Sequence, residues 1–213
     1  MVPLSRRERA ALCDLLDHVG SSAPTLCAGW TSFELVAHLV LREAAPLSAT
    51  GIVVPGLDAL TARAMRRLQR RHGFAVLVER LRSGPPRWSP MRMEPVDARA
   101  NAWEFFVHHE DLRRAQPSWV PRDLATADED VLWRRLRSTG RLLARRAPVG
   151  VELVRSDRAG VARVKPGEPT LVVRGRAGEL ALFVSGRAAV ARVEYGGDAD
   201  AREAVSGWHG VAQ

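Results

Sequence analysis

Several features that would identify common protein classes are scarce or missing in this chain of 213 residues. No apolar run approaches the roughly 20 residues that a membrane-spanning helix needs. The arginines of Met1–Arg9 are not followed by an apolar segment, as a secretion signal would require. Cys13 and Cys27 have no C-x-x-C spacing, so we predict buried thiols rather than a zinc ribbon or a disulfide framework. These absences predict a cytoplasmic protein without a membrane partner.

Motifs for covalent catalysis and nucleotide binding are missing too. The sequence contains no G-x-S-x-G nucleophile motif and no glycine-rich loop that would cradle phosphate groups. It therefore gives no support to an acyl-transfer hydrolase or a nucleotide-binding protein. Lysine is nearly absent, with Lys165 alone, so arginine supplies almost all of the basic side chains.

The formal net charge of +8 is concentrated in the first part of the chain. Residues 1–148 carry 23 basic and 16 acidic side chains, whereas residues 149–213 carry 9 and 8. The arginine doublets, such as Arg66-Arg67 and Arg134-Arg135, fall on separate predicted helices and form no basic strip interleaved with aromatic residues. We therefore predict no nucleic-acid partner, while a basic nucleic-acid accessory protein stays open as an alternative.

The first 147 residues have the apolar periodicity of helices. Leucines at helical spacing predict a helix over residues 5–19 that ends at Gly20. Thr31 and Glu34 form a capping box that predicts the start of a second helix, and Pro46 ends it after about Ala45. A loop is expected at 51–56 and a linker at 83–90. Further helices are expected over residues 57–81, as one helix or as two broken near Gly73, and over residues 96–116 and 128–146.

After Pro148 the pattern changes to short β-branched runs separated by glycine, proline and aspartate. Strands are expected at 149–155, 160–165, 170–174 and 190–195, a helix at 199–205, and either a helix or a strand at 178–186. The fold class predicted is α+β, with a helical domain over residues 1–147 and a small α+β domain over residues 148–213.

One helix of the first domain has an unusual polar stripe. At 100° per residue, five polar side chains of this helix lie within an arc of about 80°. Large apolar residues such as Trp103, Phe105 and Val107 flank the stripe, so we predict that it faces the protein interior. A bound cation would compensate buried carboxylates and neutral imidazoles. The stripe consists of Asp97, Asn101, Glu104, His108 and Asp111.

Glu104 and His108 are four residues apart and can therefore reach one ion. A catalytic zinc site usually has three protein ligands and one open position, so a third ligand is needed. His38 is the best candidate, because it lies within an apolar helical run. Asp111 could orient a ligand histidine or add a fourth ligand. His109 projects away from the stripe, which predicts a surface or helix-packing residue.

Three segments resemble the mycothiol-dependent maleylpyruvate isomerase family, part of the DinB-like metal-binding four-helix bundles. They are Cys27-Ala-Gly-Trp-Thr31, Ala37-His-Leu-Val-Leu-Arg-Glu43 and Glu104-Phe-Phe-Val-His-His-Glu-Asp-Leu-Arg-Arg114. The resemblance covers most of the chain. It implies a DinB-like four-helix bundle over residues 1–147 and a sterol-carrier-like domain over residues 148–213.

The resemblance also implies a chemistry. It implies a divalent metal, usually zinc, held by His38, Glu104 and His108, and it matches Arg187 to an active-site arginine of the small domain. The metal would ionise the thiol of mycothiol, which would attack an electrophilic substrate in an isomerase or S-transferase reaction. Arg187 would hold a substrate carboxylate. A metal-binding sensor or regulatory protein without turnover stays open as an alternative.

Overall fold

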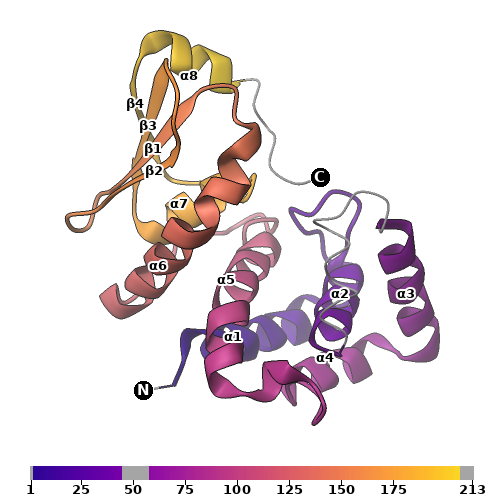
Figure 1. The fold of residues 1–213 in the computed structure, drawn as a ribbon. Helices are drawn as coiled ribbons and strands as arrows, with labels where there is room; N and C mark the ends of the chain where they lie inside the picture. Colours follow the sequence, from indigo (N-terminus) through magenta and orange to yellow (C-terminus); the bar gives the residue numbers. More distant parts are fainter. Residues whose placement is uncertain (1, 45–57, 207–213) are drawn as a thin grey trace. The chain divides into compact units, whose positions relative to one another are not determined.

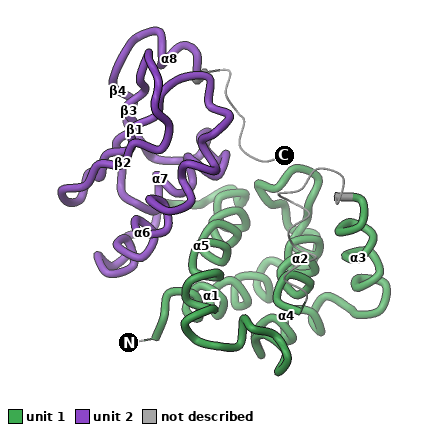
Figure 2. Tube along the Cα trace, in the orientation of Figure 1, with its two compact units in different colours: residues 1–120 green, residues 121–213 purple. Residues whose placement is uncertain are grey.

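A computed structural model describes residues 2–44 and 58–206 of the chain (Figure 1). The chain divides into two compact units, residues 1–120 and 121–213 (Figure 2). The helix expected at 128–146 belongs to the second unit, because it packs against a neighbouring helix and strand there. The chain therefore divides before this helix, whereas the sequence predicts the domain boundary after it, between residues 147 and 148.

Helices build the first unit, at nearly the positions that the apolar periodicity predicts. The segment at 57–81 is two helices, with Gly73 as the residue before the second one, so the second of the two expected arrangements is correct. The linker expected at 83–90 leads into one turn of 3₁₀ helix, Pro90–Arg92. The α-helices described in this unit are α1 (Leu4–Val19), α2 (Ser32–Ala44), α3 (Asp58–Arg71), α4 (Phe74–Arg82) and α5 (Glu94–Arg113).

The capping box forms as expected at the start of α2. The backbone N–H of Thr31 donates to Glu34 Oε2 at 2.9 Å, and the N–H of Phe33 donates to Thr31 Oγ1 at 3.2 Å. Two amides that the helix itself leaves without a partner are thereby satisfied. The helix end expected at Pro46 and the loop expected at 51–56 lie outside the described residues.

The core of the first unit is made of leucines contributed by several helices. Leu12 and Leu16 of α1, Leu35 of α2, Leu81 of α4 and Leu112 of α5 have no exposed side-chain surface. Burial of each such side chain contributes about 1.5–3 kcal/mol. The core thus fixes α1, α2 and α5 against one another, and these helices carry the polar residues described below.

The second unit is a small mixed sheet with helices, so the predicted α+β fold class is confirmed. Within the described residues the sheet has strand order β2-β1-β3-β4, with β1 and β3 parallel and the two other pairings antiparallel. Its strands are β1 (Gly150–Arg155), β2 (Val161–Lys165), β3 (Thr170–Gly175) and β4 (Glu194–Gly197), and its helices are α6 (Thr126–Leu143), α7 (Ala177–Val184) and α8 (Ala199–Ser206).

The structure decides the type of one element of this unit and corrects the position of another. The segment at 178–186 forms the helix α7 rather than a strand. The last strand lies at Glu194–Gly197 and not at 190–195. The N–H groups of Val190 and Ala191 donate to the carbonyl of Arg187, which forms a turn and removes these residues from strand pairing. Among the described residues, no helix is both long enough and apolar enough to cross a bilayer.

Candidate metal centre

The polar stripe of α5 faces the interior of the first unit, as its apolar borders predict. Asp97, Asn101 and Asp111 are almost completely buried. Glu104 is the most accessible member, with 24% of its side chain exposed. Solvent can therefore reach the carboxylate of Glu104, whereas the other polar side chains of the stripe are buried.

His38 of α2 lies against this stripe, at its accessible carboxylate. Its Nε2 atom is 3.4 Å from Glu104 Oε1, and the Nε2 atom of His108 is 3.3 Å from the same oxygen. The two imidazole centroids are 5.3 Å apart. The structure thus brings together the three residues that the sequence selected as metal ligands, and we call His38, Glu104 and His108 the first cluster.

The spacing of the first cluster suits a tetrahedral ion. Two ligand atoms about 2.05 Å from zinc, at the tetrahedral angle, are about 3.3–3.4 Å apart. The two Nε2-to-Oε1 distances in the cluster, 3.4 and 3.3 Å, agree with that separation. Two imidazoles and a carboxylate are also the usual ligands of catalytic zinc. The donor set and its geometry therefore fit a divalent cation.

Charges in the first cluster are arranged to hold Glu104 ionised. Burial raises the pKa of Glu104, but the positive charge of Arg42 and hydrogen bonds with the two histidines hold it well below its usual value. Burial lowers the pKa of His38, which keeps that ring neutral and able to donate a lone pair. The cluster therefore offers a carboxylate and a neutral imidazole to a cation.

The pKa of His108 is shifted in the opposite direction from that of His38. Burial lowers its pKa, but hydrogen bonds with Asp111, Cys27 and Glu104 outweigh burial and raise the pKa well above the usual value. A positive charge on this ring compensates the carboxylates around it when the cluster holds no cation. A bound divalent ion would supply that charge instead, and the ring would then be neutral.

Asp111 determines which nitrogen of His108 faces the first cluster. His108 Nδ1 is 2.9 Å from Asp111 Oδ2, and a protonated Nδ1 donates a hydrogen bond to this carboxylate. In the neutral ring the lone pair is then on Nε2, the atom that faces Glu104. A carboxylate behind a ligand histidine is a common feature of zinc sites. This contact favours the orienting role expected for Asp111 over that of a fourth ligand in the first cluster.

The thiol of Cys27 also lies beside the Asp111 carboxylate. Cys27 Sγ is 3.2 Å from Asp111 Oδ2 and 3.9 Å from His108 Nδ1. Cys27, His108 and Asp111 form a second group of possible ligand atoms, which we call the second cluster. Cys13 is buried as predicted, whereas Cys27 is only partly buried.

The loop between α1 and α2 places Cys27 there. Thr25 Oγ1 donates to the carbonyl of Trp30 at 2.9 Å and accepts the N–H of Cys27 at 3.2 Å. The N–H of Leu26 donates to the backbone carbonyl of Asp111 at 3.1 Å, which ties the loop to α5. The Trp30 ring packs against His38, with centroids 5.1 Å apart. One loop therefore supports a ligand of each cluster.

Arg42 connects the first cluster to a buried polar network. Its Nε atom is 3.4 Å from Glu104 Oε1, and its other nitrogens donate to the side chain of Asn101 and, at 3.1 Å, to the carbonyl of Ala100. Asn101 in turn donates to Asp97 Oδ1 at 2.8 Å. Arg42 thus contacts the Glu104 carboxylate and stabilises its negative charge.

The neighbouring ionisable residues of α5 have structural partners. His109 is buried and its Nδ1 lies 2.8 Å from Glu8 Oε2 on α1, so the helix-packing interpretation of His109 is confirmed. Arg114 pairs with Glu110 one turn before it. His109 thus joins α5 to α1, whereas the Glu110–Arg114 pair lies at the end of α5.

Arg187 lies in the second unit, directly after α7. Its guanidinium donates to the carbonyl of Ser185, and its N–H donates to the carbonyl of Leu182 at 2.9 Å. Arg187 and the first cluster belong to different compact units, and the role of Arg187 at the active site stays a prediction.

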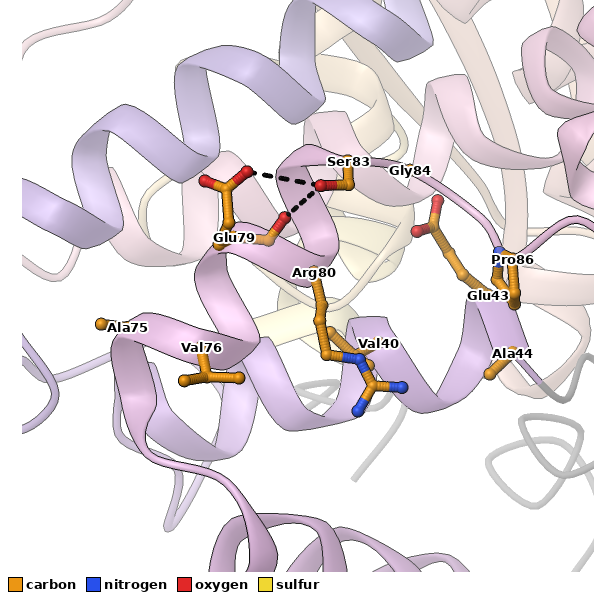
Figure 3. A pocket seen from close by; sticks show the side chains of 10 residues that line it. All are labelled: Val40, Glu43, Ala44, Ala75, Val76, Glu79, Arg80, Ser83, Gly84 and Pro86. Carbon is orange, nitrogen blue, oxygen red and sulfur yellow. Dashed lines mark hydrogen bonds between the residues drawn. The ribbon is translucent and has the colours of Figure 1, made fainter.

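A separate pocket of about 560 Å³ lies between α2 and α4 (Figure 3). Val40 and Glu43 line it from α2, and Val76 and Arg80 line it from α4. Its lining is mostly apolar and contains no histidine or cysteine, and the Glu43 carboxylate is paired with Arg9. This pocket has no residue of either cluster.

Two residues at the clusters, Arg42 and Cys27, are not predicted as site residues from the sequence. Arg42 is four residues after His38, so the i, i+4 spacing could have placed it on the same helix face. Cys27 gave no such signal, because it is in a loop and approaches α5 only through the tertiary fold.

Two solved structures resemble the chain over nearly its whole length. One is the crystal structure of a mycothiol-dependent maleylpyruvate isomerase, with a TM-score of 0.57 at 18% identity, covering 92% of this chain and 91% of that one. The other, a histidine-to-alanine mutant of a mycothiol-dependent maleylpyruvate isomerase, has a TM-score of 0.57 at 17% identity and the same coverage. The chain has the fold of these isomerases. No protein-family model and no curated protein sequence matches it.

Proposed function

We propose that this protein is a zinc-dependent enzyme that uses a small thiol such as mycothiol in an isomerase or S-transferase reaction. The observation that carries the proposal is the convergence of His38 and His108 on Glu104, the most accessible residue of a buried polar stripe, with each Nε2 atom at tetrahedral spacing from Glu104 Oε1. The fold shared with mycothiol-dependent maleylpyruvate isomerase supports the same assignment.

Each residue of the site has a distinct part in this function. His38 and His108 would offer Nε2 lone pairs to the ion, and Glu104 would offer its carboxylate. Bound there, a divalent cation supplies the positive charge that keeps a thiol ionised near neutral pH, ready for addition to an electrophilic substrate. Asp111 fixes the tautomer of His108, and Arg42 holds Glu104 ionised and in place.

The exposure of the ligands supports access by small molecules. The His38 side chain is 1% exposed, whereas that of Glu104 is 24% exposed. Three protein ligands leave one position of a tetrahedral ion for an external group. The accessible side of Glu104 is where a thiol would approach that position.

The proposal is tested first by metal content. His38→Ala, Glu104→Ala and His108→Ala, purified as folded proteins in the presence of zinc, should each retain far less zinc than the parent. His109→Ala is the matched control, because it removes a neighbouring buried histidine outside the cluster and should leave zinc content unchanged. Zinc content equal to that of the parent in the three cluster variants would show that the site is wrong.

Turnover tests the second part of the proposal. The zinc-loaded parent, incubated with mycothiol and a panel of electrophilic substrates such as cis-unsaturated dicarboxylates, should show a thiol-dependent rate that the three cluster variants lose. A parent that binds zinc through the first cluster but shows no thiol-dependent reaction would leave a metal-binding sensor or regulatory protein as the function.

A further inference from the structure

The second cluster places sulfur, nitrogen and oxygen donors around one small region. Its three separations are 3.2 Å between Cys27 Sγ and Asp111 Oδ2, 3.9 Å between Cys27 Sγ and His108 Nδ1, and 2.9 Å between His108 Nδ1 and Asp111 Oδ2. For zinc-type bonds of about 2.3 Å to sulfur and about 2.0–2.1 Å to nitrogen and oxygen, each separation lies within about 0.5 Å of its tetrahedral value.

We propose that Cys27, Asp111 and Nδ1 of His108 form a second cation site, selective for a soft, thiophilic metal ion, that competes with the first cluster for His108. A thiolate ligand favours soft ions over the hard ions that carboxylates alone would bind. The proposal adds a site to the one in the proposed function and does not depend on enzyme activity.

Competition follows from the chemistry of the imidazole ring. A neutral ring has one lone pair, which is on Nε2 when Nδ1 carries the proton and on Nδ1 when Nε2 carries it. The first cluster uses Nε2 of His108, and the second uses Nδ1. A cation in the second cluster expels the Cys27 thiol proton and the Nδ1 proton, and the ring keeps its proton on Nε2. His108 can then no longer bind an ion in the first cluster, because its Nε2 atom carries a proton.

The cluster is held in place before any ion binds. The Leu26 N–H bond to the Asp111 carbonyl ties the cysteine loop to α5, and Thr25 closes the loop around Cys27. The loop includes Gly29, whose φ of 74° is in the left-handed region that glycine adopts readily. A thiol presented in this fixed position, and only partly buried, can meet an incoming ion without rearrangement of the helices.

Cadmium titration of the full-length, metal-free protein tests the proposal. The parent should develop the ultraviolet charge-transfer band of a cadmium–thiolate bond. Cys27→Ser should abolish that band and lower the Cd²⁺ affinity by on the order of 100-fold, because a hydroxyl is a poor ligand for a soft ion. The serine keeps a donor for Asp111, so unchanged Cd²⁺ binding in this variant would show that Cys27 acts only as a hydrogen-bond donor and would overturn the site.

Two further variants separate the two clusters and the two cysteines. His38→Ala should keep the cadmium–thiolate band, because it removes no ligand of the second cluster, whereas loss of the band in this variant would contradict a distinct second site. Cys13→Ala should keep the band, because burial raises the pKa of Cys13 to about 12 and leaves that thiol protonated. Failure of the parent to bind zinc would count against the proposed function, and the cadmium band would still decide the second site.

Discussion

At the scale of single residues, the site depends on partners that surround the proposed ligands. His108 faces the first cluster with Nε2 because its Nδ1–H donates a hydrogen bond to Asp111. Glu104 is ionised despite partial burial because Arg42 lies beside it. Carboxylate and guanidinium groups outside the first cluster can therefore set the metal affinity of that cluster through the charge and orientation of its ligands.

Asp111→Asn should lower zinc affinity by about 10–100-fold, the usual effect of removing a carboxylate behind a ligand histidine. The amide has nearly the same shape, but it carries no charge to stabilise the ring proton on Nδ1. Competition with a chelating dye measures the affinity. Glu110→Gln is the matched control, because Glu110 is a neighbouring buried carboxylate paired with Arg114 instead. Equal zinc affinity in Asp111→Asn and the parent would remove Asp111 from the site.

At the scale of elements, α5 serves both the core and the site. One face carries fully buried apolar residues such as Phe105 and Leu112, and the polar stripe is buried as well. Asp97, near the start of the helix, is joined to α1 because it accepts hydrogen bonds from Ser5 Oγ at 2.6 Å and from Arg9 at 2.8 Å. Asp97, the first residue of the stripe, therefore holds α5 against α1, and α5 carries two of the proposed ligands.

This contact makes stability depend on pH. Burial raises the pKa of Asp97, but hydrogen bonds from Ser5 and Asn101 and the charge of Arg9 outweigh burial and hold the pKa below its ordinary value of 3.8. A depressed pKa in the folded state means that the ionised carboxylate stabilises the fold above about pH 4, and that this contribution is lost as pH falls through the folded-state pKa.

Asp97→Asn should lower the free energy of unfolding by about 2 kcal/mol at pH 7, because it removes a buried charge that faces Arg9. The difference between parent and variant should shrink as the pH falls below 4, where the parent carboxyl also becomes neutral. Urea unfolding of the two metal-free proteins, followed by circular dichroism from pH 7 to about pH 3, measures both values. A difference that stays constant over this range would contradict the role given to the Asp97 charge.

At the scale of the whole molecule, the proposed functions are divided between the two compact units. His38, Glu104 and His108 belong to residues 1–120, whereas Arg187 belongs to residues 121–213. Metal binding and substrate recognition are therefore expected to be separable by mutation. The shared fold with mycothiol-dependent maleylpyruvate isomerase extends over both units, since it covers 92% of the chain.

Arg187→Ala should leave zinc content unchanged and reduce kcat/KM for a carboxylate-bearing substrate by about 100-fold, equivalent to about 2.7 kcal/mol. The reason is loss of a guanidinium contact to the substrate carboxylate. Arg174→Ala, which removes an exposed arginine of β3 in the same unit, should change neither value. Loss of zinc together with turnover would instead point to a structural role of Arg187.

Much of the site was predictable because helices obey a fixed period. The 100° spacing selected Glu104 and His108 from the stripe and set His109 apart, and the structure gives His109 a packing contact with Glu8. Short β-branched runs predicted the strands less accurately: the last strand was placed too early, because the turn at Arg187 depends on backbone hydrogen bonds that composition does not specify.

The sequence by itself determined which residues share a helix face, since that depends only on local geometry. The stripe of α5 and the apolar run around His38 are of this kind. The α+β order of elements also followed from local patterns. Only the tertiary structure decided which faces meet. It brought His38 to within 3.4 Å of Glu104, Cys27 to within 3.2 Å of Asp111, and α6 into the second compact unit. These contacts join residues far apart in the chain, and they arise from the packing of whole elements around a common core, which no local period encodes.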